Sequence, residues 1–255
     1  MSNEPFHASK LKVKQAEHHI ADLNLVLTAF IAKHPYVVVG KQDSSGTDNI
    51  IQVDQTEPFP CEVPLIIGDA IHNLRSSLDL MACDLVLLSN GNIENVYFPF
   101  AESATDLEKA IKDRRINRAT PDVVDLIRRL KPYRGGNKLL RAIHDLDIND
   151  KHRLIIPILE YAVVQDTTIR LSGNNIIKIG TIVTQPGNKG MNLVKYPSDW
   201  YAQIEHHGET SVHINFGKGQ PLEGEHIVSS LYQMISEIQG IIEMFEVHCL
   251  RQKQS

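Results

Sequence analysis

The stretch Asn149-Asp150-Lys151-His152-Arg153 stands where the chain changes character. Before it, apolar residues recur at steps of three and four, which is the period of amphipathic helices. After it, β-branched runs alternate with Gly-Asn turns, which is typical of antiparallel strands. We therefore expect an α+β fold in which a helical bundle is followed by an antiparallel β meander, and a last helix returns to the bundle.

On this pattern, residues 1–255 form a single α+β domain. Residues 1–153 are expected to be mainly helical with a small hairpin near 36–54, residues 154–217 to form the sheet, and residues 223–252 to pack back on the bundle as a C-terminal helix. Ser103 with Asp106 predicts a capping box, and Thr120-Pro121-Asp122 predicts a further helix start. The expected helices cover residues 8–33, 64–88, three shorter segments between 103 and 150, and 223–251.

Composition limits the protein's class and setting. Hydrophobic residues make up 42% of the chain, which supports a sizeable core, and the net charge of −5 gives no general attraction to nucleic acid or acidic lipid. The three cysteines are far apart and form no CxxC pair, so we expect a reducing, cytoplasmic setting. The polar segment 1–5 predicts no signal peptide, and charged residues interrupt the apolar stretch 65–88, so we expect no membrane span.

Two polar rows on two expected helices form the candidate site. His72, Arg75 and Asp79 lie on one side of the apolar stripe of the helix over 64–88, at about 100° per residue, and Arg75 and Asp79 are an i,i+4 pair of opposite charge. On the helix before the sheet, Asp150 falls on the core face, beside a second row that comprises His144, Asp147 and Lys151. Charged and imidazole groups are costly to bury singly, so we expect the two rows to meet.

Two interpretations of this meeting remain open. In the first, Arg75 orients a carboxylate or phosphate, Asp79 or Asp150 holds an imidazole, and His152 or His72 is the acid and base. In the second, Asp150 and Arg75 form a buried ion pair that fixes two helices in register, and the histidines are inert. The candidate catalytic residues are His152, Arg75, Asp79 and Asp150, and the candidate ligand-binding residues are His72, Lys151, Arg153, Tyr133, Arg134 and Lys138.

Four strings resemble a widespread family of uncharacterised bacterial proteins: Gly68-Asp69-Ala70-Ile71-His72-Asn73-Leu74-Arg75-Ser76-Ser77-Leu78-Asp79, Phe98-Pro99, Lys131-Pro132-Tyr133, and Leu146-Asp147-Ile148-Asn149-Asp150-Lys151-His152-Arg153. The resemblance covers residues 64 to 157. Leu80 stands where that family often has a histidine, so no role for the histidine carries over. The resemblance implies no activity. It does imply that one unit is formed by Arg75, Asp79, Asp150, Lys151, His152 and Arg153.

A looser similarity is to the HEPN class of helical domains, many of which are RNases in toxin or defence systems. Their mark is an arginine followed four to six residues later by a histidine on a helix. Arg75 has no histidine at that distance, and Arg141 meets His144 too early and His152 too late. This departure argues against a standard HEPN nuclease and leaves a HEPN-like relative, tied to stress or defence, as what the similarity implies.

A local basic segment is hidden by the overall negative charge. Residues 112–141 carry ten Lys and Arg against three Asp, a local charge of +7 that leaves −12 for the rest. Tyr133-Arg134-Gly135-Gly136-Asn137-Lys138 precedes a helix, where free backbone N–H groups and an aromatic ring suit a small anion or RNA. In the alternative, the segment is a solvated face whose arginines pair with acids from elsewhere.

Two hypotheses from different classes follow. The first is a cytoplasmic binding or regulatory protein, tied to stress or defence, in which the polar helix pair is structural or holds an anionic ligand. The second is a HEPN-like nuclease or another enzyme that acts on a phosphodiester or nucleotide. No GxSxG, HExxH, P-loop or Rossmann glycine string is present, and we expect no cofactor and no metal site. The long terminal helices could also mediate a homodimer.

Overall fold

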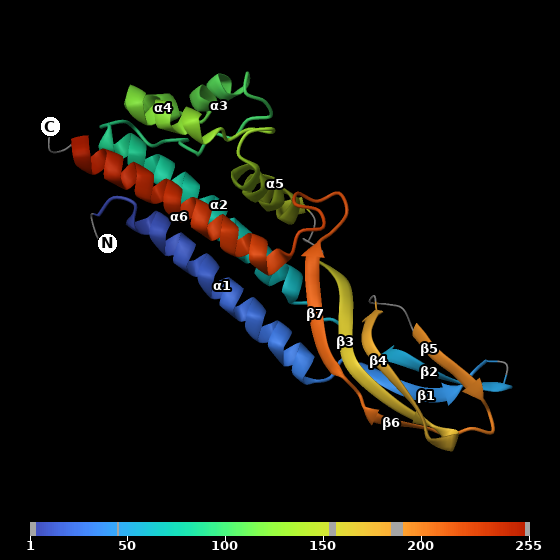
Figure 1. The fold of residues 1–255 in the computed structure, drawn as a ribbon. Coiled ribbons are helices and arrows are strands. Elements are labelled where there is room, and N and C mark those ends of the chain that lie inside the picture. Colours follow the sequence, from blue (N-terminus) through green and yellow to red (C-terminus); the bar gives the residue numbers. More distant parts are fainter. Residues whose placement is uncertain (1–3, 45, 153–156, 185–190, 253–255) are drawn as a thin grey trace. The chain divides into compact units, whose positions relative to one another are not determined.

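The protein is described by a computed structural model that covers residues 4–44, 46–152, 157–184 and 191–252 (Figure 1). The fold class is α+β, as expected from the sequence. The chain divides into two compact units, each assembled from separated segments. The first unit comprises residues 1–23, 64–156 and 218–255, and the second comprises residues 24–63 and 157–217.

The first unit is helical. Its long helices bury the apolar stripes that the sequence predicts, since Ile67, Leu74 and Leu78 of the second helix are fully buried, as are Leu231 and Ile238 of the last. Its elements are α1 (His7–Ala32, up to residue 23), α2 (Val63–Leu88), α3 (Leu107–Asp113), the 3-10 helix η1 (Ile116–Arg118), α4 (Pro121–Leu130), α5 (Lys138–His152) and α6 (Ile227–Gln252).

Polar contacts join α1 to its two long neighbours, beside which it runs in Figure 1. The Lys10 ammonium lies 2.6 Å from the Glu246 carboxylate of α6, and the Lys12 ammonium donates to the Asn73 side chain of α2 at 3.0 Å. These contacts and the buried apolar stripes join the three long helices α1, α2 and α6 in a bundle around the core of this unit.

Within the described ranges, no helix has the length and apolar character needed to cross a membrane.

The predicted helix starts are confirmed for α4 and differ for α3. Thr120 is extended and Pro121 opens α4, as the cap-and-proline pattern predicts. The third helix begins only at Leu107, because the Ser103 hydroxyl donates to the Asp106 carboxylate at 2.6 Å and no side-chain cap bond forms. The capping box predicted at Ser103 is therefore wrong.

The second unit carries the strands. One sheet has the order β1-β2-β5, and its hairpin pairs Tyr36 with Gln55. In the other sheet the long β3 is central: β4 pairs along one side, while β7 and β6 share the other. The strands are β1 (Tyr36–Gln42), β2 (Asp48–Gln55), β3 (Pro157–Leu171), β4 (Asn175–Thr184), β5 (Met191–Pro197), β6 (Ala202–His206) and β7 (Glu209–Phe216).

Candidate functional site

The two predicted polar rows face each other between α2 and α5. Arg75 contacts His144, His72 contacts Asp147, and the backbone at Gly68 packs against the Asp150 carboxylate. Residue numbers fall along α5 as they rise along α2, so the two helices are antiparallel and meet once per turn. We call this set the polar seam, and its members are Gly68, His72, Arg75, His144, Asp147 and Asp150.

Arg75 is enclosed within this seam. Its side chain is 12% exposed, and its Nη1 lies 2.6 Å from Asp79 Oδ1, which confirms the predicted helical ion pair. Its Nε donates to His144 Nδ1 at 3.3 Å, and the guanidinium carbon lies 4.8 Å from the centroid of the Phe100 ring. Asp79 also accepts the backbone N–H of Phe98 at 2.8 Å. A ligand would have to displace these contacts to reach either charge.

His144 is held neutral by its surroundings. Its ring stacks on Phe100 with centroids 4.3 Å apart and an interplanar angle of 7°. Burial, followed by the positive charges of Arg75 and Arg141, lowers the pKa of His144 from 6.5 to about 3. Because Nδ1 accepts from Arg75, the proton of the neutral ring is on Nε2. His144 therefore packs between α2 and α5 without a positive charge near neutral pH.

His72 is the solvent-facing histidine of the seam. Its side chain is 49% exposed, and its Nδ1 lies 2.8 Å from Oδ1 of Asp147, a carboxylate that is 4% exposed. The Oγ of Ser76, one turn later on α2, lies 3.3 Å from His72 Nε2. The predicted imidazole–carboxylate pair is therefore present, but the carboxylate is Asp147, whereas the sequence analysis proposed Asp79 or Asp150.

The remaining predicted seam residues are placed only in part. A Cβ added at Gly68 would lie 2.7 Å from the Asp150 carboxyl carbon, so Asp150 reaches α2 seven residues before Arg75, about 10 Å along the helix. The carboxylate that pairs with Arg75 is that of Asp79, and not Asp150 as one interpretation had it. The side chains of Lys151 and His152, and all of Arg153, lie outside the described residues.

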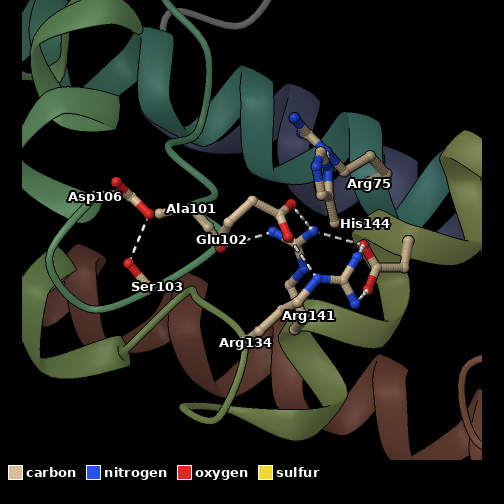
Figure 2. A network of polar contacts seen from close by, with 9 residues as sticks. Arg75, Ala101, Glu102, Ser103, Asp106, Arg134, Arg141 and His144 are labelled. Atoms are coloured by element: carbon tan, nitrogen blue, oxygen red, sulfur yellow. Dashed lines mark hydrogen bonds and ion pairs between the residues drawn. The ribbon is translucent and has the colours of Figure 1, made fainter.

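An open groove of about 740 Å³ lies beside α5 and contains a cluster of alternating charges. Arg134 contacts Glu102 at 2.6 Å and Asp145 at 2.9 Å. Arg141 contacts the same two carboxylates, at 2.6 Å for Glu102 and 2.8 Å for Asp145. Figure 2 shows the two guanidinium groups converging on the Glu102 carboxylate. We call these four residues the charged cluster.

Local structure brings the cluster together. Gly135 has φ +82°, which lets the chain turn sharply after Arg134, and the Asn137 side chain caps α5 by accepting the Leu140 N–H at 3.0 Å. Arg141 also donates to the carbonyl oxygen of Ala101 at 2.8 Å. This last bond anchors the loop that carries Glu102, so a residue distant in sequence completes the cluster.

The cluster is electrostatically matched and exposed on one side. Hydrogen bonds from Arg134 and then Arg141 lower the pKa of Glu102, although its side chain is 68% exposed. Arg141, in contrast, is 8% exposed, and its Nε has no hydrogen-bond acceptor among the described residues. Glu102 is thus a solvent-accessible carboxylate that rests on a buried arginine.

Acids from outside the basic segment neutralise much of its charge. Arg128 pairs with Glu108 at 2.7 Å, and the Lys138 ammonium pairs with Glu225. Arg118 donates to the carbonyl oxygens of two loop residues at 2.6 and 2.9 Å. For these residues the geometry matches the interpretation in which the segment is a solvated, ion-paired face. Binding of RNA by the segment, and base stacking on Tyr133, stay predictions.

Sequence reasoning did not select several polar residues of the seam, its adjacent turn and the groove. Two of them carried a readable signal: Asp145 follows Arg141 by four residues, and Ser76 follows His72 by four, so each pair shares a helix face. Asp147 was seen in its row but was not selected. Glu102 carried no such signal, because its loop reaches α5 only through tertiary contacts.

The role of the site is identified neither by an arrangement of metal ligands nor by similarity to known proteins. Within the described residues, no group of three or more His, Cys, Asp or Glu side chains is arranged to hold a metal ion. The resemblance to an uncharacterised bacterial family and to HEPN domains stays a prediction. No protein-family model, no curated protein and no solved structure matches this chain.

Proposed function

We propose that this protein binds a small anionic molecule in the groove, where Arg134 and Arg141 hold its carboxylate or phosphate group. One observation carries the proposal: the two arginines already hold an anionic group, the exposed Glu102 carboxylate, at 2.6 Å each. Planar guanidinium groups bind carboxylates and phosphates through the same paired N–H donors. A ligand anion that replaces Glu102 would therefore keep the contacts of the cluster.

Replacement of the Glu102 carboxylate by a ligand anion should cost little free energy. An ion pair that is open to solvent contributes only about 0–1 kcal/mol, and Glu102 is 68% exposed. Arg141 does not need Glu102 to stay in place, because it is also held by Asp145 and by the Ala101 carbonyl oxygen. The cationic side of the site is thus preorganised, which lowers the cost of binding.

The groove also indicates the size and charge of the ligand. Its volume of about 740 Å³ lies within the range of roughly 300–1,000 Å³ that is usual for small-molecule sites. Lys138 lines the same groove and adds a third cationic side chain, whose present partner is the Glu225 carboxylate. We therefore favour a ligand with more than one anionic group, such as a nucleotide or a dicarboxylate, over a single halide-like ion.

The wider setting belongs to the same proposal. We propose a binding or regulatory protein of the cytoplasm with a role in stress or defence, and the family resemblance implies a bacterial source. No disulfide forms among the cysteines that the structure describes, which agrees with a reducing compartment. The nuclease alternative, with His152 and Arg75 at its centre, stays a prediction, since Arg75 contacts Asp79 and His144 while the side chain of His152 lies outside the described residues. A homodimer stays a prediction.

Calorimetric titration with inorganic phosphate, AMP and succinate tests the binding proposal. We expect at least one of them to bind, Glu102→Gln to bind it more tightly because the internal competitor has lost its charge, and Arg134→Ala to bind at least tenfold more weakly. Arg128→Ala is the matched control, since Arg128 also pairs with two carboxylates, Glu108 and Asp125, but does not line the groove.

Two results would overturn the proposal. One is that neither the wild type nor Glu102→Gln binds any of the three anions. The other is that Arg128→Ala weakens binding as much as Arg134→Ala, which would show a general charge effect.

The nuclease alternative has a separate test, in which wild type and His152→Ala are incubated with RNA at matched folding. Equal cleavage by both, or none by either, would count against the nuclease alternative.

A further inference from the structure

We infer that Ser76, His72 and Asp147 form a second chemical site, in which the serine is a nucleophile, the histidine its base and the aspartate the positioning residue. The distances run in the required order. Ser76 Oγ lies 3.3 Å from His72 Nε2, and His72 Nδ1 lies 2.8 Å from Asp147 Oδ1. All three residues belong to the polar seam or to the adjacent turn of α2, and none lines the groove.

The hydrogen-bond partners fix the tautomer of the histidine. An ionised carboxylate can only accept, so the proton of the neutral His72 ring is on Nδ1, where it is donated to Asp147. Nε2 is then the acceptor, and the Ser76 hydroxyl is the donor. This is the arrangement of an activated serine: nucleophile to Nε2, and Nδ1–H to a buried carboxylate.

The orientation of Ser76 is unusual among the helical serines of this chain. Ser230 donates to the carbonyl oxygen of His226 at 2.9 Å, and Ser236 donates to that of Tyr232 at 3.1 Å. Such backward bonding to the carbonyl four residues earlier is the ordinary state of a serine within a helix. Ser76 instead meets the imidazole of the residue four positions earlier. This contact requires the His72 ring to be held in place, and the hydrogen bond between His72 and Asp147 fixes the ring.

Exposure separates the parts as their roles require. The Asp147 side chain is 4% exposed, which keeps its hydrogen bond to the ring out of competition with water, while His72 is 49% exposed and Ser76 is half-buried. The nucleophile and base can therefore be reached from solvent, whereas the positioning residue cannot. A purely structural use of Asp147 would not require its partner to be exposed.

The chemistry that the three residues support is acyl transfer from an ester to water. Ser76 Oγ attacks the ester carbonyl carbon as its proton passes to His72 Nε2, which forms a tetrahedral intermediate. The C–O bond to the alcohol then breaks, and the departing alkoxide takes the proton from Nε2. Water attacks the acyl-Ser76 ester in the same way, delivering a proton through His72 back to Ser76 Oγ and releasing the carboxylic acid. No oxidant or reductant takes part.

The position of Ser76 within a helix limits the class of ester. Ser76 lies inside α2, where the backbone N–H groups are bound to carbonyl oxygens four residues earlier, so the described part of this helix offers no free pair of N–H donors to an oxyanion. The loss of one such donor costs about 10²–10³ in rate. We therefore infer activated esters, which have good leaving groups, as the substrates, and not peptides.

Labelling of the full-length protein with a fluorophosphonate tests the inference, because this reagent phosphonylates serines that are activated by a base. Mass spectrometry of the digested protein should locate the label on Ser76. Ser236, an exposed helical serine without an imidazole partner, is the internal control in the same sample and should stay unlabelled. His72→Gln should slow labelling at least tenfold, and hydrolysis of p-nitrophenyl acetate should fall by a similar factor in Ser76→Ala.

The role of Asp147 has a separate readout. In Asp147→Asn the amide can donate to Nδ1, so the ring proton should move to Nε2, which would then no longer accept from Ser76. Nitrogen–proton correlation spectra of the His72 ring report this tautomer directly. If Asp147→Asn does not fold, the labelling rate of His72→Gln, a change at a half-exposed position, tests the inference instead. Absence of label from Ser76, or equal labelling rates in wild type and folded His72→Gln, would overturn the inference.

Discussion

The polar seam and the charged cluster each contain a largely buried arginine that pairs with a carboxylate, yet these carboxylates differ in exposure. Arg75 lies beneath the Phe100 ring and its partner Asp79 is 29% exposed, whereas Glu102, the partner of Arg141, is 68% exposed at the edge of a groove. Removing water strengthens charge–charge contacts and makes each unpaired charge costly, while an exposed pair exchanges easily with solvent. The comparison shows that burial, more than residue type, separates a cluster that holds helices from one that can take a ligand.

One helix contributes to both regions. On α5, His144 and Asp147 face α2, while Arg141 and Asp145 face the groove. The two rows are interleaved in sequence, because neighbouring positions on a helix diverge by about 100°. Changes on one row can therefore be compared with changes on the other within the same helix, which makes the contrast between seam and groove experimentally accessible.

The largest expected difference between the regions is in stability. Arg75→Ala should lower the free energy of unfolding by about 3 kcal/mol, because it leaves Asp79 and the His144 ring without their enclosed partner. Arg128→Ala, which breaks exposed pairs with Glu108 and Asp125, should cost less than about 1 kcal/mol. Urea unfolding of both variants measures this. Equal losses would mean that the seam is no better shielded than the surface.

A smaller effect is expected from acid. The pKa of His144 is about 3 in the folded protein and near 6.5 in the unfolded chain, so between these values the unfolded state binds the extra proton. The stability associated with the neutral ring is therefore complete above pH 6.5 and is lost as the pH falls toward 3. At pH 5 we expect a loss of about 1–2 kcal/mol, allowing for some solvent screening.

Unfolding free energies at pH 7 and pH 5 check this expectation. The His144→Gln variant should lack that part of the acid loss, since glutamine does not titrate. His18→Gln, a change at an exposed position of α1, is the control and should retain the full loss. If wild type and His144→Gln lost the same amount between the two pH values, the burial of His144 would not be what sets its charge.

The parts of the fold that could be predicted are those with a strong local pattern. The stripe through Ile67, Leu74 and Leu78 could be predicted because these apolar residues recur at helical spacing, and the structure buries each of them fully. The sequence places residues 154–217 in one sheet, whereas β5 pairs with β2 of the hairpin, because no local pattern reports a pairing between strands so far apart in the chain. The capping box at Ser103 failed because its two side chains bond to each other and do not reach the backbone of α3.

The site could be predicted only as far as helical spacing reaches. The Arg75–Asp79 pair lies within one helix, and its spacing predicted it correctly. Which acid of α5 meets His72 depends on the register between two helices, and a shift of one turn exchanges Asp150 for Asp147. Glu102 reaches the groove through a loop that Arg141 anchors, and no periodicity in the sequence reports such a contact.

The smallest expected effect tests how closely the two helices of the seam approach. Gly68 and Gly240 both lie within long helices, where alanine is favoured over glycine by about 1 kcal/mol. At Gly240 an added Cβ meets nothing within 4 Å, so Gly240→Ala should raise the free energy of unfolding by up to that amount. At Gly68 the added Cβ would lie 2.7 Å from the Asp150 carboxyl carbon, so the carboxylate must move and the gain should disappear.

A double variant separates the two contributions at Gly68. In a background that carries Asp150→Ala, the obstructing carboxylate is absent, and Gly68→Ala should then stabilise the protein about as much as Gly240→Ala does. Chemical unfolding of the single and double variants gives each value. If Gly68→Ala were as stabilising as Gly240→Ala in the wild-type background, the seam would be loose enough to admit a methyl group. His72 and Asp147, one turn away, would then be held less firmly than a positioned base requires.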